Sequence, residues 1–134
     1  MRLIFAVVTG YVVFAVSAAL LFQMTGQDPH ATPELMFALM SIVWGVAFAA
    51  LAGYVASRAS QREGLRPSLL VGCLIATGAL VSLLLEGKNA SPWSQLSALL
   101  AMAPSTLLGG IVYRRRVAEK RAVEKNAATK AEGG

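Results

Sequence analysis

The chain has 134 residues, of which 56% are hydrophobic and 14% carry a charge. A water-soluble domain of this size needs more charged residues on its surface, and its apolar residues do not come in long blocks. The composition therefore excludes an ordinary soluble domain and indicates a membrane protein. The formal net charge of +5 does not indicate a nucleic-acid partner, because the positive residues lie at helix ends and in one tail and offer no folded basic surface.

Four apolar segments follow one another along the chain. They cover approximately residues 3–24, 35–57, 68–86 and 93–113. About 20 apolar residues cross the roughly 30 Å hydrocarbon layer of a bilayer, so the first two segments are amply long and the last two lie near the lower limit. Their connections are short and polar, which places neighbouring helices antiparallel. The predicted fold is therefore an all-α membrane protein with four transmembrane helices in an antiparallel bundle, residues 1–113, followed by a basic cytoplasmic tail, residues 114–134.

The first segment also has features of a signal peptide. Arg2 precedes the apolar run, and Ser17, Ala18 and Ala19 form a small-residue pattern of the kind found at cleavage sites. The apolar run is longer than the core of a typical signal peptide, however, so we expect a retained helix.

Proline residues mark where helices begin and bend. Thr32–Pro33 and Ser91–Pro92 each place a capping hydroxyl ahead of a proline, which is typical of a helix start. Pro104 instead lies within the fourth segment, where its missing backbone N–H leaves the carbonyl near Leu100 without its usual partner. We therefore expect a kink in the last helix.

The basic residues are distributed unequally between the two sides of the membrane. If the N-terminus is cytoplasmic, one of the 12 Lys and Arg residues, Lys88, lies on the outer side and the remaining 11 lie inside. The inner residues are Arg2, Arg58, Arg62, Arg66, Arg114, Arg115, Arg116, Lys120, Arg121, Lys125 and Lys130. The positive-inside rule then places both termini in the cytoplasm. The three consecutive arginines of the tail directly follow the last segment and are expected to contact anionic lipid headgroups, whereas the sequence leaves open whether the tail is helical or disordered.

Two segments carry small residues four positions apart, a spacing that places them on one helix face. In the second segment they are Ser41, Gly45, Ala49 and Gly53, and in the fourth they are Ser97, Ala101, Ser105 and Gly109. Small residues let two helix backbones approach closely. We therefore expect both faces to be helix-packing sites, either within one bundle or between subunits of a homo-oligomer or larger membrane complex.

Tyr11 and Trp44 are unusual because they lie near the middle of their segments, whereas Trp93 lies near the headgroup level that such residues usually occupy. In hydrocarbon their polar atoms require hydrogen-bond partners. The candidate partners are Thr9, Ser17, Ser41 and Thr77. Tyr11 and Trp44 therefore either form structural hydrogen bonds or line a ligand pocket.

The sequence contains no catalytic motif. No Asp, Glu, Lys, Arg or His lies in the core of a predicted helix, and Cys73 is a lone cysteine within an apolar segment. Asp28, His30 and Glu34 cluster in the first outer loop, which we interpret as a polar hairpin and not as a metal site. We therefore expect no enzymatic activity, no cofactor and no bound metal.

The second segment ends in a Gly-Tyr-Val-Ala-Ser-Arg sequence, residues 53–58. In this pattern and in its four helices, the chain resembles uncharacterised small bacterial inner-membrane proteins. It is also similar in size to the small multidrug resistance transporters, but it lacks the glutamate that this family carries in its first helix. The resemblance implies a multi-pass protein of the bacterial inner membrane with no assigned activity. We expect a non-catalytic accessory, scaffold or self-associating subunit, with a small transporter for a neutral or lipophilic solute as the alternative.

Overall fold

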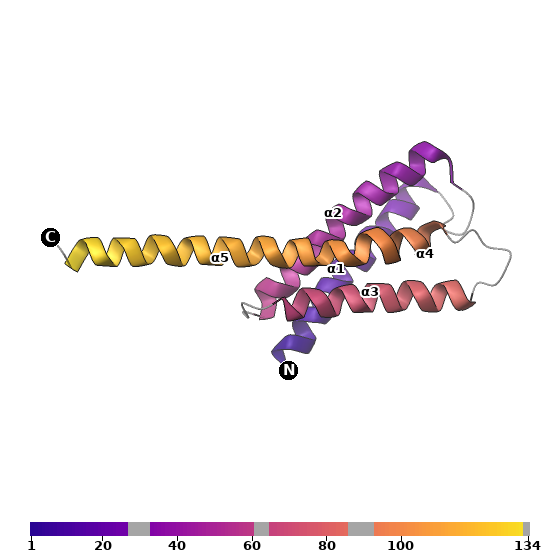
Figure 1. Ribbon diagram of the computed structural model, residues 1–134. Helices are drawn as coiled ribbons and strands as arrows, with labels where there is room; N and C mark the ends of the chain where they lie inside the picture. Colours follow the sequence, from indigo (N-terminus) through magenta and orange to yellow (C-terminus); the bar gives the residue numbers. More distant parts are fainter. Residues whose placement is uncertain (27–32, 61–64, 86–92, 133–134) are drawn as a thin grey trace.

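The computed structural model describes residues 1–26, 33–60, 65–85 and 93–132, and these residues are almost entirely helical (Figure 1). The elements in chain order are α1 (Arg2–Thr25), α2 (Leu35–Ser60), α3 (Arg66–Leu85), α4 (Trp93–Ser97), the π-helical segment η2 (Ala98–Met102) and α5 (Ala103–Glu132). The last three follow one another without a break. Within the described residues, four helical stretches are long and apolar enough to cross a membrane, which confirms the predicted all-helical class.

The interior and the surface of the protein are the reverse of those of a soluble bundle. Fully buried positions are occupied mostly by small residues, and Ala49, Ala52 and Ala56 are each 0% exposed. Large apolar side chains cover the outside instead, as Phe5 (72% exposed) and Leu85 (80% exposed) illustrate. In water a continuous apolar surface of this kind is unfavourable, because its side chains stay in contact with water.

The most closely packed part of the bundle is the junction of α2, α3 and α5. A Cβ atom added at Gly53 would overlap the backbone carbonyl of Thr106, and one added at Gly109 would overlap the carbonyl of Ala50. On α3, a Cβ atom at Gly72 would lie 2.7 Å from the Thr106 hydroxyl oxygen. Glycine at these positions therefore lets α2 and α3 approach α5 closely.

Thr106 stabilises this junction through its side chain as well as its backbone. Its hydroxyl is fully buried and lies within hydrogen-bonding distance of two carbonyl oxygens, that of Ser68 on α3 (3.0 Å) and that of Ala103 one turn earlier (2.7 Å). The single hydroxyl hydrogen is shared between them. The bond to Ser68 joins α5 to α3 directly. Nearby on α2, the Ser57 hydroxyl is buried without a hydrogen-bond partner among the described residues.

The irregular segment η2 lies directly before Pro104. The Ala103 N–H donates to the carbonyl of Ala98, five residues earlier, so the last turn before the proline is wider than an α-helical turn. Pro104 has no N–H to offer Leu100, and the Ser105 hydroxyl donates to the carbonyl of Ala101. The irregularity therefore lies where the sequence predicts a kink, and its form is a π-helical turn.

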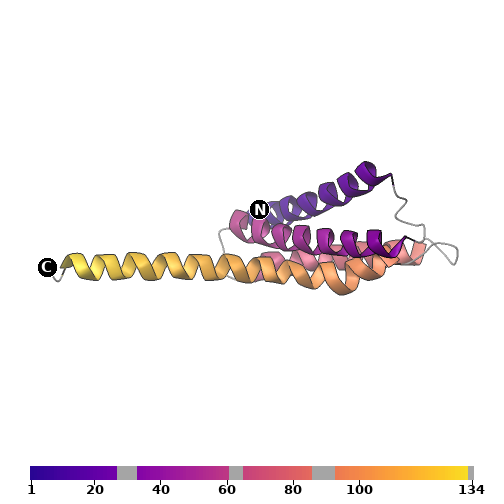
Figure 2. The same ribbon diagram turned by 90° about the horizontal axis from the view of Figure 1, so that it is seen from above.

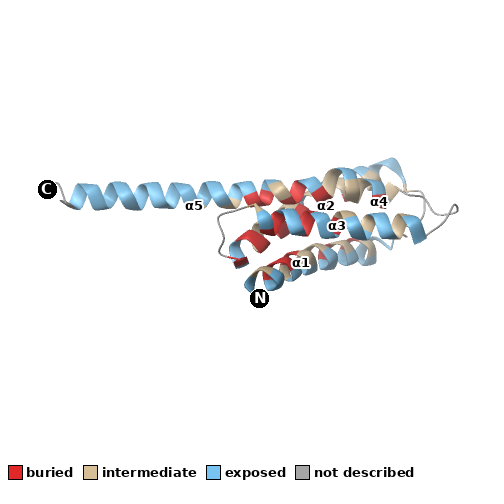
Figure 3. Ribbon diagram, turned by 60° about the horizontal axis from the view of Figure 1, so that its bottom comes forward, coloured by how far each residue is buried: buried red, intermediate tan, exposed pale blue. Residues whose placement is uncertain are grey.

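Two ends of the bundle can be distinguished. The basic end holds the start of α1, the end of α2 and the start of α3, and it carries Arg2, Arg58 and Arg66 (Figure 1). Buried residues gather in this half, whereas the half near α4 holds few of them (Figure 3).

Beyond the basic end, α5 continues as a straight helix, away from the other helices, up to Glu132 (Figures 1 and 2). The tail whose conformation the sequence left open is therefore helical in the structure. Nearly all of its residues from Arg114 onward are exposed.

Candidate functional site: a cavity between the helices

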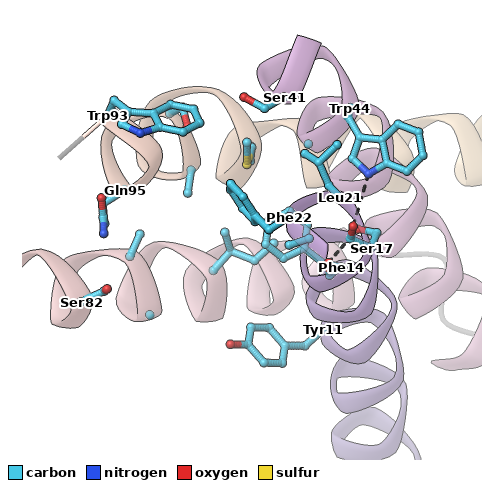
Figure 4. A pocket seen from close by; sticks show the side chains of 18 residues that line it. Tyr11, Phe14, Ser17, Leu21, Phe22, Ser41, Trp44, Ser82, Trp93 and Gln95 are labelled. Carbon is cyan, nitrogen blue, oxygen red and sulfur yellow. Dashed lines mark hydrogen bonds between the residues drawn. The ribbon is translucent and has the colours of Figure 1, made fainter. Parts of the chain in front are cut away.

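A cavity of about 260 Å³ lies in the half of the bundle opposite the basic end (Figure 4). Residues of α1, α2, α3, α4 and η2 line it. The cavity lies in the half where few residues are buried and where the last helix is broken into α4 and η2. The tightly packed junction around Gly53 and Thr106 lies nearer the basic end.

Aromatic rings form much of the cavity wall. Five of the lining residues are aromatic: Tyr11, Phe14, Phe22, Trp44 and Trp93. Phe37 links two of them from outside the cavity, because its ring makes edge contacts with Phe22 at 6.2 Å and with Trp93 at 6.1 Å between centroids. Trp93 therefore packs against a neighbouring helix and lines the cavity.

Most polar groups on the wall already have hydrogen-bond partners. The Ser17 hydroxyl donates to the carbonyl of Phe14 (2.7 Å), and the Ser41 hydroxyl donates to the carbonyl of Ala38 (2.9 Å). The indole N–H of Trp44 donates to the backbone carbonyl of Ser17 at 3.4 Å, which joins α2 to α1 (Figure 4). Ser82, Trp93, Gln95 and Ser97 also have partners.

Tyr11 differs from these residues, because its hydroxyl has no hydrogen-bond partner among the described residues. The side chain extends from α1 along the cavity (Figure 4). Gly78 on α3 lies opposite, and a Cβ atom added there would be 3.8 Å from the Tyr11 hydroxyl oxygen, with no closer neighbour. A side chain that begins at position 78 would therefore be in ordinary van der Waals contact with the Tyr11 hydroxyl.

Among the residues that the structure describes, those that line the cavity include no Asp, Glu, His, Lys or Arg. The described part of the chain also contains no group of three His, Cys, Asp or Glu residues that could hold a metal ion. Of the predicted polar loop, Glu34 is exposed, while Asp28 and His30 lie outside the described residues. Arg62, Glu86 and Lys88 lie outside them as well.

The two predicted stripes of small residues lie on α2 and on the stretch from α4 to α5. Ser41, Gly45, Ala49 and Gly53 are all buried on α2, and a Cβ atom added at Gly45 would overlap the Met102 side chain of η2. In the last helical stretch, Ser105 and Gly109 are buried, whereas Ser97 and Ala101 are half-buried. Ser41, Gly45 and Ser97 also line the cavity. The headgroup candidates Arg114, Arg115 and Arg116 are exposed just beyond the basic end.

Three residues of this region were not singled out from the sequence. Gln95, which is 6% exposed, and Gly78 line the cavity, and Thr106 joins α5 to α3. For Gln95 a signal did exist, because an amide side chain near the start of an apolar segment needs hydrogen-bond partners in a membrane. Gly78 and Thr106 look ordinary in a sequence of this composition, since glycine and threonine are common in membrane helices.

Comparisons of the chain with protein-family models, with curated proteins and with solved structures found no match. The geometry of the cavity and the distribution of charge and apolar surface are therefore the features that bear on function.

Proposed function

We propose that this chain is a four-span protein of the bacterial cytoplasmic membrane, with antiparallel helices, that binds a small, neutral, largely apolar solute in its cavity. The membrane placement is supported by the apolar outer surface over an interior of small residues. The binding role is supported by one main observation, a partly aromatic cavity between the helices whose described lining carries no acidic or basic side chain. Such a protein acts as a binding or permeation unit and not as an enzyme.

The orientation we propose places the basic end and both termini in the cytoplasm. Arg2, Arg58, Arg66 and the run Arg114–Arg116 all belong to this end, which agrees with the bias expected of the cytoplasmic side. A reporter that is active only outside the cytoplasm should be inactive when fused after residue 134 and active when inserted next to Gly26. The reverse pattern would contradict the orientation.

Solute binding can be followed with the protein's own fluorescence. The chain contains two tryptophans, Trp44 and Trp93, and both line the cavity. A bromonaphthalene, which is neutral and bicyclic, should quench their emission in a saturable way, because bromine quenches only at close range. A cavity of about 260 Å³ exceeds the roughly 150 Å³ that holds a benzene molecule and approaches the smallest drug-binding pockets, so a two-ring probe fits.

The variant Gly78→Leu separates binding in the cavity from partition into detergent. A Cβ atom at position 78 would meet no backbone atom within 4 Å and would touch the Tyr11 hydroxyl. Because Gly78 lines the cavity, a leucine there should occupy part of it, and the affinity for the probe should fall by at least about tenfold, or about 1.4 kcal/mol. The matched control is Thr77→Leu on the same helix, since Thr77 lies outside the cavity lining and should bind as wild type does. Equal quenching in wild type and Gly78→Leu would mean that the cavity binds nothing, and the proposed function would be wrong.

A second candidate function is favoured by the cytoplasmic part of α5. About 19 residues of this helix, or about 28 Å at 1.5 Å per residue, extend beyond the bundle as an exposed rod with a basic start. A helix held clear of the bundle in this way is suited to an accessory or scaffold subunit that presents it to a larger membrane complex. If the cavity binds no probe, this becomes the better explanation.

A further inference from the structure

We propose that the solute is an uncharged ring-containing molecule, flat and aromatic, with an oxygen atom that accepts a hydrogen bond from the Tyr11 hydroxyl. This inference rests on the proposed binding function and specifies the chemical class of the ligand. Three features of the cavity support it: the Tyr11 donor, the aromatic walls, and the lack of charged side chains in the described lining.

Several hydrogen-bond donors of the cavity wall have acceptors within the protein. The hydroxyls of Ser17 and Ser41 donate to carbonyls of their own helices, and the Trp44 N–H donates to Ser17. Tyr11 carries a phenolic hydrogen whose partner is not found among the described residues. In a membrane interior an unsatisfied hydroxyl is costly, because no water is present to accept its hydrogen. A ligand with a carbonyl, ether or hydroxyl oxygen satisfies it.

Aromatic rings from α1, α2 and α4 line the same cavity as Tyr11. Phe14 and Tyr11 on α1, and Trp44 on α2, lie around the cavity with Trp93 at the α4 side (Figure 4). Trp44 also stacks against Phe48 with centroids 4.9 Å apart and planes inclined by 30°, which holds the indole in place. Two aromatic rings in offset or edge contact stabilise each other beyond the apolar area that they bury. A flat ring therefore gains more in this cavity than an aliphatic ring of equal size.

Charge sets the last restriction on the ligand. The described lining offers no counter-ion to an anionic or cationic group, and transferring an unpaired charge into such a site is strongly unfavourable. Phosphate-bearing and ammonium-bearing molecules are thereby disfavoured.

Four probes test this class against its alternatives. They are a bromonaphthalene with an acetyl group, the same ring system with an ethyl group, a bromodecalin with an ethyl group, and a bromonaphthalene with a carboxylate group. All have similar size, and each is titrated against wild type, Tyr11→Phe, Gly78→Leu and the control Thr77→Leu. Tyr11→Phe keeps the ring and loses no bond seen in the structure, so it should fold as wild type does.

We expect the acetyl probe to bind more tightly than the ethyl probe by roughly two- to tenfold, the range that a neutral hydrogen bond contributes. Tyr11→Phe should remove this difference and leave the ethyl probe unaffected. The decalin should bind more weakly than the ethylnaphthalene, and the carboxylate should not bind measurably. Thr77→Leu should reproduce every wild-type value.

The possible failures are distinguishable. If no neutral probe binds in a manner sensitive to Gly78→Leu, the proposed function itself is wrong. If the acetyl and ethyl probes bind equally and Tyr11→Phe changes neither, the cavity is a site for apolar molecules in general and the role of Tyr11 is refuted. If the decalin probe binds with the same affinity as the ethylnaphthalene probe, the preference for an aromatic ring is refuted. If the carboxylate probe binds, the requirement for an uncharged ligand is refuted.

Discussion

Gly53→Leu should destabilise the bundle strongly, by about 3 kcal/mol or more, at or beyond the upper end of the range for overpacked cores. A side chain at position 53 has nowhere to go, because its first carbon would already overlap the Thr106 carbonyl on α5. The two helices must separate, and the hydrogen bond from Thr106 to Ser68 is disturbed with them. Thermal unfolding in a mild detergent, followed by far-ultraviolet circular dichroism, measures the loss.

The matched control is the same substitution at a glycine where an added Cβ atom makes no clash. At Gly78 that atom would make one ordinary contact, with the Tyr11 hydroxyl at 3.8 Å, and leucine has a higher helix propensity than glycine, so Gly78→Leu should be at least as stable as wild type. Gly109→Leu, whose added atom would overlap the Ala50 carbonyl, should behave like Gly53→Leu. Equal stability of Gly53→Leu and Gly78→Leu would mean that α2 and α5 are not in close contact. The same control shows that weak probe binding by Gly78→Leu reflects a filled cavity and not an unfolded protein.

Much of the fold can be predicted from the sequence because a lipid environment restricts the length, composition and packing of helices. Long apolar blocks give the number and approximate ends of the spanning helices, and the small-residue spacing points to the face of α2 that the structure buries. The kink expected at Pro104 has a local cause, a missing backbone donor, so its place is also predictable.

The cavity depends on features that one sequence does not reveal. It forms because the half of the bundle near α4 is packed less closely than the glycine-rich junction, and this difference follows from how the helices cross. Trp44 is an example of a hydrogen bond whose acceptor the sequence alone does not identify. The need of its N–H for a partner was predictable, but the acceptor is the backbone carbonyl of Ser17 and not a hydroxyl; the Ser17 hydroxyl donates to the carbonyl of Phe14. The partnership of Thr106 with Ser68 likewise joins residues 38 positions apart.

Pro104→Ala should make the protein more stable and weaken its cavity. Alanine restores a backbone N–H that can donate to the Leu100 carbonyl, so η2 can return to a regular α-helix, with a gain on the order of 1–3 kcal/mol compared with a proline inside a helix. A π turn holds one residue more than an α-helical turn. When it becomes α-helical, the stretch before it rotates by about 100°, the angle per residue in a helix with 3.6 residues per turn. Ala98 and Met102 then leave the cavity wall, and Trp93 loses its contact with Phe37.

We therefore expect a higher unfolding temperature together with a loss of bromonaphthalene binding of at least about tenfold, equivalent to about 1.4 kcal/mol. Pro67→Ala is the matched control, because Pro67 lies in the first turn of α3, where an added N–H has no carbonyl within the helix to bind. Pro67 is also fully buried, so its replacement should give no gain in stability. A Pro104→Ala variant with wild-type binding and unchanged stability would show that the π turn is held by packing around Met102 and not by the proline. A stabilised variant that no longer binds would show that Pro104 keeps the cavity open at a cost in stability, which is the trade expected of a functional site.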